Sequence, residues 1–138
     1  MKKENYIAYC ESKYLRISPF KTRKVADIIR GMNVVDALKV LKVQPQKAAR
    51  FVYKSLHSAL HNALNKGSIL EDELFVDAII VDESKSLKRF KPRARGRAFT
   101  ILKRSCHIKI GLNKKSNNIV ASKQSKSENV GDKNGTKS

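Results

Sequence analysis

The spacing of apolar residues changes twice along the chain. Residues 5–17 alternate loosely between apolar and polar positions and favour a strand. From residue 18 to residue 66, apolar side chains recur every three or four positions, which is the period of an amphipathic helix. Beyond that segment, residues 74–81 and 99–110 are rich in β-branched residues and indicate two more strands. This order of elements predicts an α+β fold.

Three helices fit within the middle segment, over residues 19–30, 34–43 and 45–66. Ser18 and Asn33 supply N-caps for the first two, a proline opens the first and the third, and a glycine follows each of these. The third helix is the longest, and its apolar stripe spans five turns, wide enough to face a sheet. The residues expected to face inward are Val25, Ile28, Ile29, Val34, Val35, Leu38, Leu41, Ala49, Val52, Tyr53, Leu56, Ala59, Leu60, Ala63 and Leu64.

The two later strands flank a basic run, so the simplest topology joins them as an antiparallel hairpin. We expect its projecting part at about residues 82–100. If residues 84–97 fold back on themselves, about seven residues per side at about 3.3 Å each reach roughly 23 Å past the sheet. The predicted architecture is three helices packed on a small antiparallel sheet, with a long projecting β-hairpin.

The basic run carries much of the formal net charge of +18. From Leu87 to Phe99 it holds six cations, two phenylalanines, one proline and one glycine, and no acid occurs between Ser84 and Asn113. Cations at this density cannot be buried without partners. Such concentrated charge is typical of nucleic-acid binding, because each neutralised phosphate releases condensed counterions.

The kinds of side chain in the run sharpen this interpretation. Five of the nine arginines lie in the segment from Arg89 to Arg104, whereas the basic residues after Gly111 are all lysines. Guanidinium groups bind phosphate bidentately and stack on bases, so we expect specific contacts from residues 84–111 and diffuse attraction from the tail. Phe90 and Phe99 can stack on unpaired bases. A solvated loop, a localisation patch or attraction to another polyanion or a membrane surface is the competing interpretation.

Composition divides the chain into one domain and a tail. Residues 1–111 are expected to form a single RNA-binding domain. Residues 112–138 form a basic low-complexity tail that has too little apolar area to offset the entropy of ordering, so we expect it to be disordered when free. No apolar stretch approaches the roughly 20 residues of a membrane span, and the start of the chain has no hydrophobic signal region. We expect an unexported protein with no membrane partner.

Catalytic and metal-binding interpretations find little support. His57 and His61 have the i, i+4 spacing of helical zinc sites but no third ligand nearby. Cys106 and His107 are neighbours on a predicted strand, so their side chains point to opposite faces. Cys106 and Cys10 are expected to be small buried thiols rather than a disulfide. We expect no enzyme activity, no cofactor and no metal.

Two questions stay open on the residues alone. Half of the acids lie within residues 71–83, where they either keep the hairpin base away from phosphate or protect a strand edge.

The alternative function is a free-standing basic regulator that binds DNA or varied RNAs. A helix that reads a major groove needs a cationic face that reaches the bases. The cations of the third helix are only Lys47, Arg50, Lys54 and Lys66.

The hairpin sequence resembles a known family. The residues that carry the resemblance are Leu87-Lys88-Arg89-Phe90, Pro92-Arg93-Ala94-Arg95-Gly96-Arg97-Ala98, Ile101, Lys103-Arg104 and His107-Ile108. Upstream they continue through Ser18-Pro19, Lys21, Arg23, Arg30-Gly31, Ala37-Leu38, Pro45, Lys47-Ala48-Ala49, Ser58-Ala59 and Asn62-Ala63. Over roughly residues 6–110 the chain resembles the bacterial-type large-subunit ribosomal protein twenty-two family.

The resemblance implies a structural protein that binds large-subunit ribosomal RNA, supports its assembly and lines the nascent-peptide exit tunnel with its hairpin. Neighbouring large-subunit proteins and the nascent peptide at the tip are the other implied partners. With the basic run, it gives the expected RNA-binding residues as Lys21, Arg23, Lys85, Lys88, Arg89, Phe90, Lys91, Arg93, Arg95, Arg97, Lys103, Arg104 and His107. In the family picture, Arg104 and His107 anchor the hairpin base.

Two positions depart from the family pattern. Ser84-Lys85 stands where the family usually has Gly-Pro, so the bend leading into the hairpin is expected to be looser. Leu64 replaces a glutamate common late in the third helix and extends its apolar stripe. The missing transit segment favours a cytoplasmic ribosome over an organellar one.

Overall fold

The computed structural model describes residues 5–67 and 70–114. Its elements follow the predicted α+β order. The strands and helices are β1 (Ala8–Leu15), α1 (Pro19–Ile29), α2 (Val34–Val43), α3 (Lys47–Leu64), β2 (Leu74–Pro92) and β3 (Ala98–Lys114), and short 3-10 turns occupy Glu71–Glu73 and Ala94–Gly96. No helix in the described part of the chain is long and apolar enough to span a membrane.

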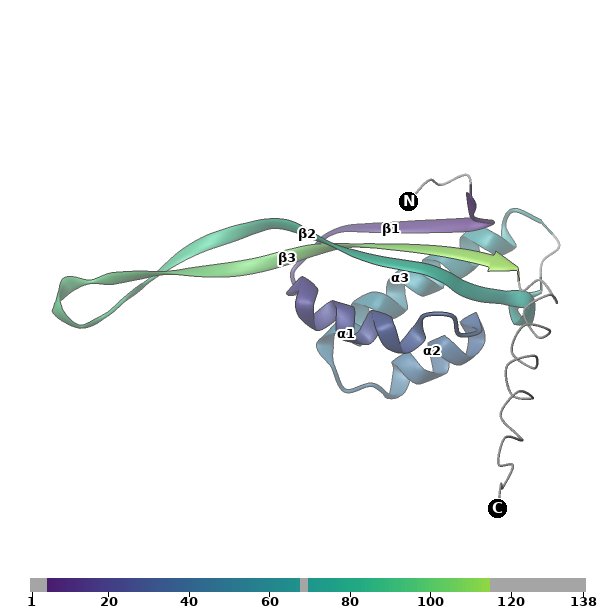
Figure 1. The fold of residues 1–138 in the computed structure, drawn as a ribbon, viewed down its shortest axis with the longest axis horizontal. Coiled ribbons are helices and arrows are strands. Elements are labelled where there is room, and N and C mark those ends of the chain that lie inside the picture. The colour runs from purple at the N-terminus through teal and green to yellow at the C-terminus, as the bar shows by residue number, and fades with distance from the viewer. Residues whose placement is uncertain (1–4, 68–69, 115–138) are drawn as a thin grey trace, which may run out of the picture.

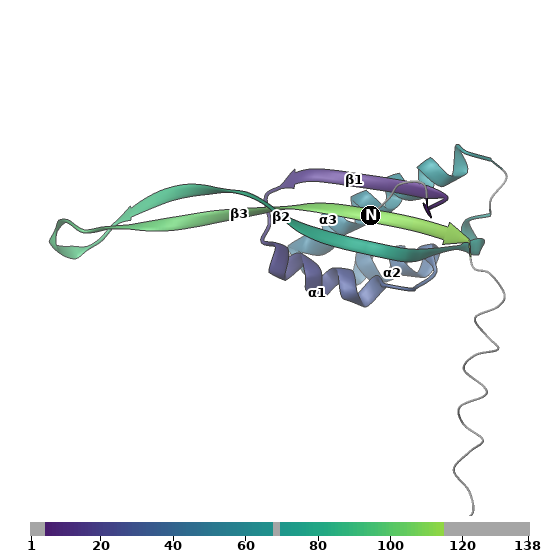
Figure 2. The same cartoon turned by 45° about the horizontal axis from the view of Figure 1, so that its top comes forward.

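The three strands form an antiparallel sheet in the order β1-β3-β2, and the three helices cover one of its faces (Figures 1 and 2). Strand β3 is central, and every second side chain from Cys106 to Leu112 is buried: Cys106, Ile108, Ile110 and Leu112. In β2, a bulge between Val76 and Ala78 shifts the register. These features confirm the predicted packing of three helices on a small antiparallel sheet.

The bulge in β2 also decides which of its residues reach the core. Leu74 and Val76 are buried on one side of the bulge, and Ile79 and Val81 are buried on the other. The extra residue inserted by a bulge puts the second pair back on the face that the helices cover. Strand β2 therefore contributes apolar side chains to the core along its whole length beside the helices.

The helix termini follow local sequence signals closely. The Asn33 side chain accepts a hydrogen bond from the Val35 N–H at 2.9 Å, which caps α2 as predicted. Ser18 occupies the N-cap of α1, although its side chain makes no capping bond. Helix α3 begins at Lys47, two residues later than expected, and Gln46 is its N-cap.

One expected core residue is wrong. Ile28 is 42% exposed, whereas its neighbour Ile29 is fully buried. The buried face of α1 is formed by Val25, Ala26 and Ile29, and Ile28 lies beside this stripe rather than within it. Helix periodicity alone does not say where the edge of a buried stripe falls.

Strand β3 continues beyond the expected end of the domain at residue 111. Leu112 is fully buried and pairs with Ala8 on one side and Val76 on the other, and the strand ends at Lys114. The strand therefore extends three residues past residue 111, where we expected the domain to end. The remainder of the predicted disordered tail, residues 115–138, lies outside the described residues.

Beyond the sheet, β2 and β3 continue as a two-stranded hairpin that projects from the body (Figure 1). The last pair that β1 makes joins Leu15 to Cys106, which is opposite Glu83. The projecting part therefore covers residues 84–105 instead of the expected 82–100. With residues 84–92 in one arm at about 3.3 Å each, it extends roughly 30 Å, longer than predicted.

Candidate nucleic-acid interface

The register of the hairpin assigns its side chains to two faces, because residues directly opposite each other in an antiparallel pair share a face. The pairs on one face are Leu87 with Lys103, Arg89 with Ile101, and Lys91 with Phe99. Those on the other face are Lys88 with Leu102, Phe90 with Thr100, and Pro92 with Ala98. Both faces thus combine cations with apolar or aromatic side chains, and neither carries an acid.

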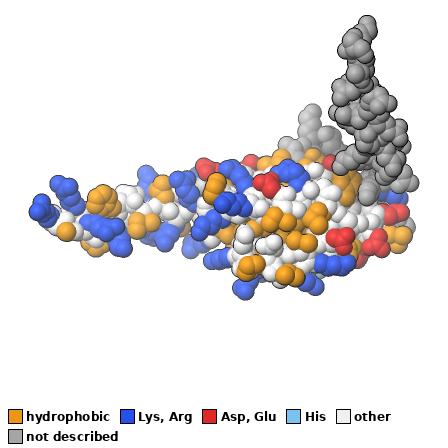
Figure 3. All heavy atoms as spheres, turned by 60° about the horizontal axis from the view of Figure 1, so that its bottom comes forward, with side chains coloured by type: hydrophobic (Ala, Val, Ile, Leu, Met, Phe, Trp, Pro, Cys, Tyr) orange, Lys and Arg blue, Asp and Glu red, His pale blue; other side chains and the backbone are white. Residues whose placement is uncertain are grey.

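The apolar side chains of the hairpin are exposed because no helix covers this part of the ribbon. Phe90 is 73% exposed and Phe99 is 58% exposed, on opposite faces. Orange and blue side chains alternate along the projecting hairpin in Figure 3. Exposed rings between cations are suited to stacking on unpaired bases while the cations contact phosphate.

The tip is a tight turn of three exposed arginines, Arg93, Arg95 and Arg97. The Arg93 N–H donates to the Arg97 carbonyl at 2.8 Å and closes the turn. Inside it, Arg95 has φ +60° and Gly96 has φ +69°. Gly96 adopts this left-handed conformation freely, whereas a non-glycine residue such as Arg95 is strained there by about 1–2 kcal/mol.

A hollow at the base of the hairpin gathers further cations. It is lined by Tyr14, Arg16, Lys85, Leu87, Arg89, Lys103, Arg104 and Ser105, and it contains no acid. Arg16 was not among the predicted contacts. It reaches the hollow because β1 pairs with β3 as far as Leu15 and Cys106, a long-range register that local sequence patterns do not reveal.

The bend at Ser84-Lys85 is a bulge held by a neighbouring strand. The register shifts between Ser84 and Leu87, and the Ser105 hydroxyl donates to the Lys85 carbonyl at 2.6 Å. The Ser84 hydroxyl is the one buried side-chain polar atom without a hydrogen-bond partner among the described residues. Ser84, at a position where the family usually has glycine, thus places a hydroxyl without a hydrogen-bond partner beside a bulge that the Ser105–Lys85 hydrogen bond holds in place.

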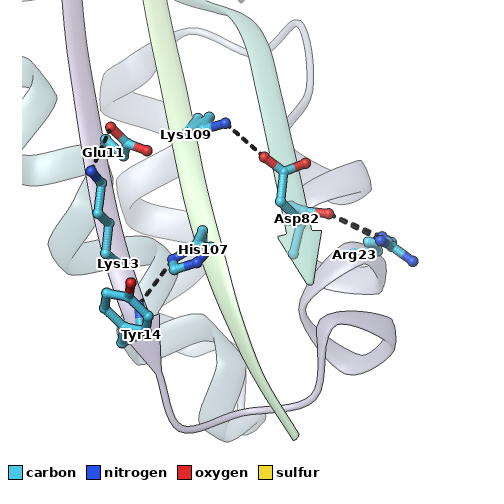
Figure 4. A network of polar contacts seen from close by, with 8 residues as sticks. Glu11, Lys13, Tyr14, Arg23, Asp82, His107 and Lys109 are labelled. Carbon is cyan, nitrogen blue, oxygen red and sulfur yellow. Dashed lines mark hydrogen bonds and ion pairs between the residues drawn. The ribbon is translucent and has the colours of Figure 1, made fainter. Parts of the chain in front are cut away.

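The acids beside the basic run pair with cations of β3. Lys109 Nζ lies 2.7 Å from an Asp82 carboxylate oxygen, and this hydrogen bond, with the charge of Asp82, raises the pKa of Lys109 (Figure 4). Lys114 pairs with Glu73 at 2.9 Å. From the sequence, these acids were expected either to keep the hairpin base away from phosphate or to protect a strand edge, and cross-strand pairing was not anticipated. The pairing neutralises the end of β3 that lies in the sheet, so the net positive charge of this strand pair is concentrated in the hairpin.

Four of the predicted contact residues have polar partners within the protein. Two of them lie in the hairpin: Arg104 Nη1 is 3.9 Å from a Glu83 carboxylate oxygen, and Arg89 Nη1 donates to the Lys88 carbonyl at 2.9 Å. Arg23 donates from Nε and Nη2 to the Val81 carbonyl at 3.3 and 3.1 Å and covers the outer edge of β2 (Figure 4). His107 Nδ1 accepts a hydrogen bond from the Tyr14 N–H at 3.0 Å. Lys21 is exposed on α1. The other predicted residues, Lys85 to Arg104, all belong to the hairpin.

Nothing in the described part of the chain groups three or more potential metal ligands. His57 and His61 are exposed, and their Nε2 atoms lie 3.3 Å apart, so the two rings hydrogen-bond to each other. Cys106 is buried, and burial raises the pKa of its thiol, which is the opposite of nucleophile activation. Cys106 and Cys10 are both free thiols.

A small α+β body with an exposed, acid-free hairpin of basic and aromatic residues has the features of a structural nucleic-acid-binding protein. Residues 10–113 match the sequence profile of the family described as ribosomal protein L22p/L17e. The chain therefore belongs to this family, whose members are structural, non-enzymatic ribosomal proteins.

Individual relatives agree with the family match. Proteins named large ribosomal subunit protein uL22 are 53% identical in Syntrophobacter fumaroxidans, over 75% of this chain and 94% of the relative, and 48% identical in Syntrophotalea carbinolica, over 78% and 98%. The Thermus thermophilus protein of that name is also 48% identical, over 75% of this chain and 92% of its own length. These matches favour a structural ribosomal protein over the free-standing regulator.

Proposed function

We propose that the chain binds large-subunit ribosomal RNA through its hairpin, supports the assembly of that RNA and lines the peptide exit tunnel. The observation that carries this proposal is the acid-free two-stranded extension, residues 84–105, which places cations and apolar side chains on both of its faces. A ribbon with one binding face would need cations on that face alone. A ribbon with two is suited to lie between RNA segments.

The chemistry of the hairpin follows from charge density. Closely packed RNA segments repel each other through their phosphates, and the lysines and arginines of the hairpin neutralise that repulsion while releasing counterions. Guanidinium groups such as that of Arg89 add bidentate contacts, and Phe90 and Phe99 add stacking. The arginine-rich turn at residues 93–97 is the part farthest from the body and is the proposed contact with the nascent peptide (Figure 1).

The body and the hairpin base have a supporting role in this proposal. Arg23 and His107 hold β2 and β1 in place, so they position the hairpin and need not touch RNA themselves. Arg16 and Arg104, in the hollow at the hairpin base, are the cations that extend the contact surface onto the body. Neighbouring ribosomal proteins are the other proposed partners, within a cytoplasmic ribosome.

The proposal is tested by the salt dependence of binding to bacterial large-subunit ribosomal RNA freed of protein. Replacing Arg89, Arg93, Arg95 and Arg97 together with alanine should flatten the slope of log affinity against log salt by about 3, since each lost contact contributes about 0.7 for single strands and 0.9 for duplex.

A matched variant removes the same number of charges from cations that have partners within the body. The control replaces Lys13, Lys24, Arg30 and Lys39 with alanine. The slope of this control should stay close to that of the wild type. If the hairpin variant and the control behave alike, the hairpin is not the RNA contact.

A further inference from the structure

Two histidines on the exposed face of α3 lie close enough to share one ion. His57 and His61 are four residues apart, and both are exposed. Their Nε2 atoms lie 3.3 Å apart, and the two rings meet edge to face with centroids 4.4 Å apart. Because residues i and i+4 are neighbours on a helix surface, the backbone itself brings the rings together. Helix α3 runs away from the hairpin towards the opposite end of the body (Figures 1 and 2).

The separation of the two nitrogens matches the span between two ligands of a tetrahedral metal ion. Zinc binds an imidazole nitrogen at about 2.0–2.1 Å, so a tetrahedral angle between two such bonds puts the nitrogens about 3.3–3.4 Å apart. A right angle between bonds of that length, as in square-planar or octahedral coordination, puts them only about 2.9 Å apart. The 3.3 Å between the Nε2 atoms of His57 and His61 therefore fits tetrahedral zinc with little movement of either ring.

The surroundings of the pair restrict the rings and favour a cation. Tyr53 is half-buried and stacks on His57, with ring centroids 5.9 Å apart and an interplanar angle of 25°. This contact limits rotation of the His57 ring, so less freedom is lost when its nitrogen binds an ion. His61 lies in the last turn of α3, where the negative end of the helix dipole stabilises positive charge. Both neighbours thus support metal binding at these two nitrogens.

One cation of the helix opposes metal binding. Lys54 lies three residues before His57 on the same face and is exposed. It is the only lysine or arginine of α3 within one turn of either histidine. Its flexible four-carbon stem can carry the ammonium group away into solvent, and repulsion between exposed charges is screened by salt. The repulsion therefore weakens the site without abolishing it.

The simpler explanation is that the two imidazoles only bond to each other. In that arrangement one Nε2 carries a proton and donates it to the other Nε2. A metal ion replaces this shared proton: the donating ring moves its proton to Nδ1, and both Nε2 lone pairs then bind the ion. An exposed hydrogen bond is exchanged for bonds to water at little net cost. The mutual hydrogen bond is therefore a weak competitor for a metal that both rings can chelate.

We infer that His57 and His61 form an open site for a divalent transition metal, with Zn²⁺ as the ion that the geometry fits best. From the sequence no metal was expected, because a third ligand is missing nearby, and within the described residues none joins the pair. An open site does not require one, since water fills the remaining positions of the ion. This inference does not depend on RNA binding, because neither histidine belongs to the hairpin.

The site is tested by titrating the full-length chain with Zn²⁺ in a calorimeter, at about pH 8, where free imidazole is neutral. The wild type should bind one ion per chain. His57→Ala and His61→Ala should each weaken binding at least about tenfold, because a single imidazole cannot chelate and even changes around metal ligands commonly cost that much. Alanine at exposed helix positions leaves α3 folded. Wild-type affinity in either variant would overturn the inference.

A matched variant keeps the number of histidines and separates them. Lys54→His combined with His57→Ala leaves histidines at positions 54 and 61, on one face but about 10.5 Å apart along the helix axis, too far to share an ion. It also removes the opposing cation, so the local charge becomes more favourable to metal. Its affinity should nevertheless be as low as that of His57→Ala. An affinity equal to that of the wild type would show that histidine count, not chelation, binds the ion, and would refute the site.

The half-buried thiol of Cys10 is another possible zinc ligand, and two measurements separate it from the histidines. Cys10→Ser should bind zinc as the wild type does, whereas loss of binding would assign the ion to the thiol. In the wild type, zinc should protect His57 and His61 several-fold from modification by diethyl pyrocarbonate, as seen by mass spectrometry. His107, whose Nδ1 already accepts the Tyr14 N–H, should react equally with and without zinc. An unprotected histidine pair at saturating zinc would contradict the inference.

Discussion

Leu112 and Leu102 lie on the same strand, ten residues apart, and should respond very differently to truncation. Leu112 is fully buried between β1 and β2, whereas Leu102 is 45% exposed on the hairpin. Leu112→Ala removes three buried carbons and leaves a cavity, which costs about 2–5 kcal/mol in well-packed cores. Leu102→Ala removes side-chain area that is half in water already and should cost less than about 1 kcal/mol.

Urea unfolding followed by circular dichroism measures both free energies of unfolding. A loss of about 3 kcal/mol corresponds to a fall of roughly 10–20 °C in Tm for a domain of this size, so thermal unfolding offers a second readout. The m-value should not change if the compactness of the unfolded state is unaltered. Equal losses in the two variants would refute the reasoning, because they would mean that Leu112 lies outside the core or that Leu102 is packed within it.

Three further predictions concern single groups at the hairpin base and in the core. Ser84→Ala removes a buried hydroxyl without a partner and should raise the free energy of unfolding by about 1 kcal/mol in the same urea assay; a lower value would mean that the hydroxyl is satisfied. Because Asp82 raises the pKa of Lys109, their pair stabilises the fold fully below the usual lysine pKa of about 10.4, and the stabilisation is lost as the pH rises through the raised value. Asp82→Asn should therefore be less stable than the wild type at pH 8, and the gap should close as the pH rises through the raised pKa of Lys109; a gap independent of pH would exclude Lys109 as its cause. Iodoacetamide should label the half-buried Cys10 well before the buried Cys106, as seen by mass spectrometry, and equal labelling rates would contradict the burial of Cys106.

Local signals in the sequence were sufficient for the elements but not for their ends. Asn33 identified the start of α2 because an N-cap acts through a backbone group two residues away. The end of β3 was missed because Leu112 is followed by polar residues and only its neighbours in β1 and β2 show that it is buried. A residue at the end of a strand and a residue of a tail can have the same local sequence. Only the pairing with neighbouring strands shows which of the two a residue such as Leu112 is.

The candidate site also contains some residues that the sequence predicted and others that only the structure reveals. Composition alone located the hairpin cations, because an acid-free run of lysine and arginine has few alternatives to an exposed surface. It could not reveal that Arg23 is bound to Val81 or that Arg16 joins the hollow, since both facts depend on contacts between residues distant in sequence. The pairing of Asp82 with Lys109 is likewise a product of strand register rather than of sequence neighbourhood.

The projecting hairpin has one more consequence, for the protein before it meets any partner. Past Glu83, neither β1 nor a helix covers the two arms, so each arm has an open strand edge to which a second copy could add. Cations at nine of the 22 positions in residues 84–105 make such pairing repulsive, as gatekeeper residues do in other exposed strands. We therefore expect the same side chains to keep newly made chains from aggregating, so that solubility depends on the hairpin charge until the proposed RNA partner replaces the water around the hairpin.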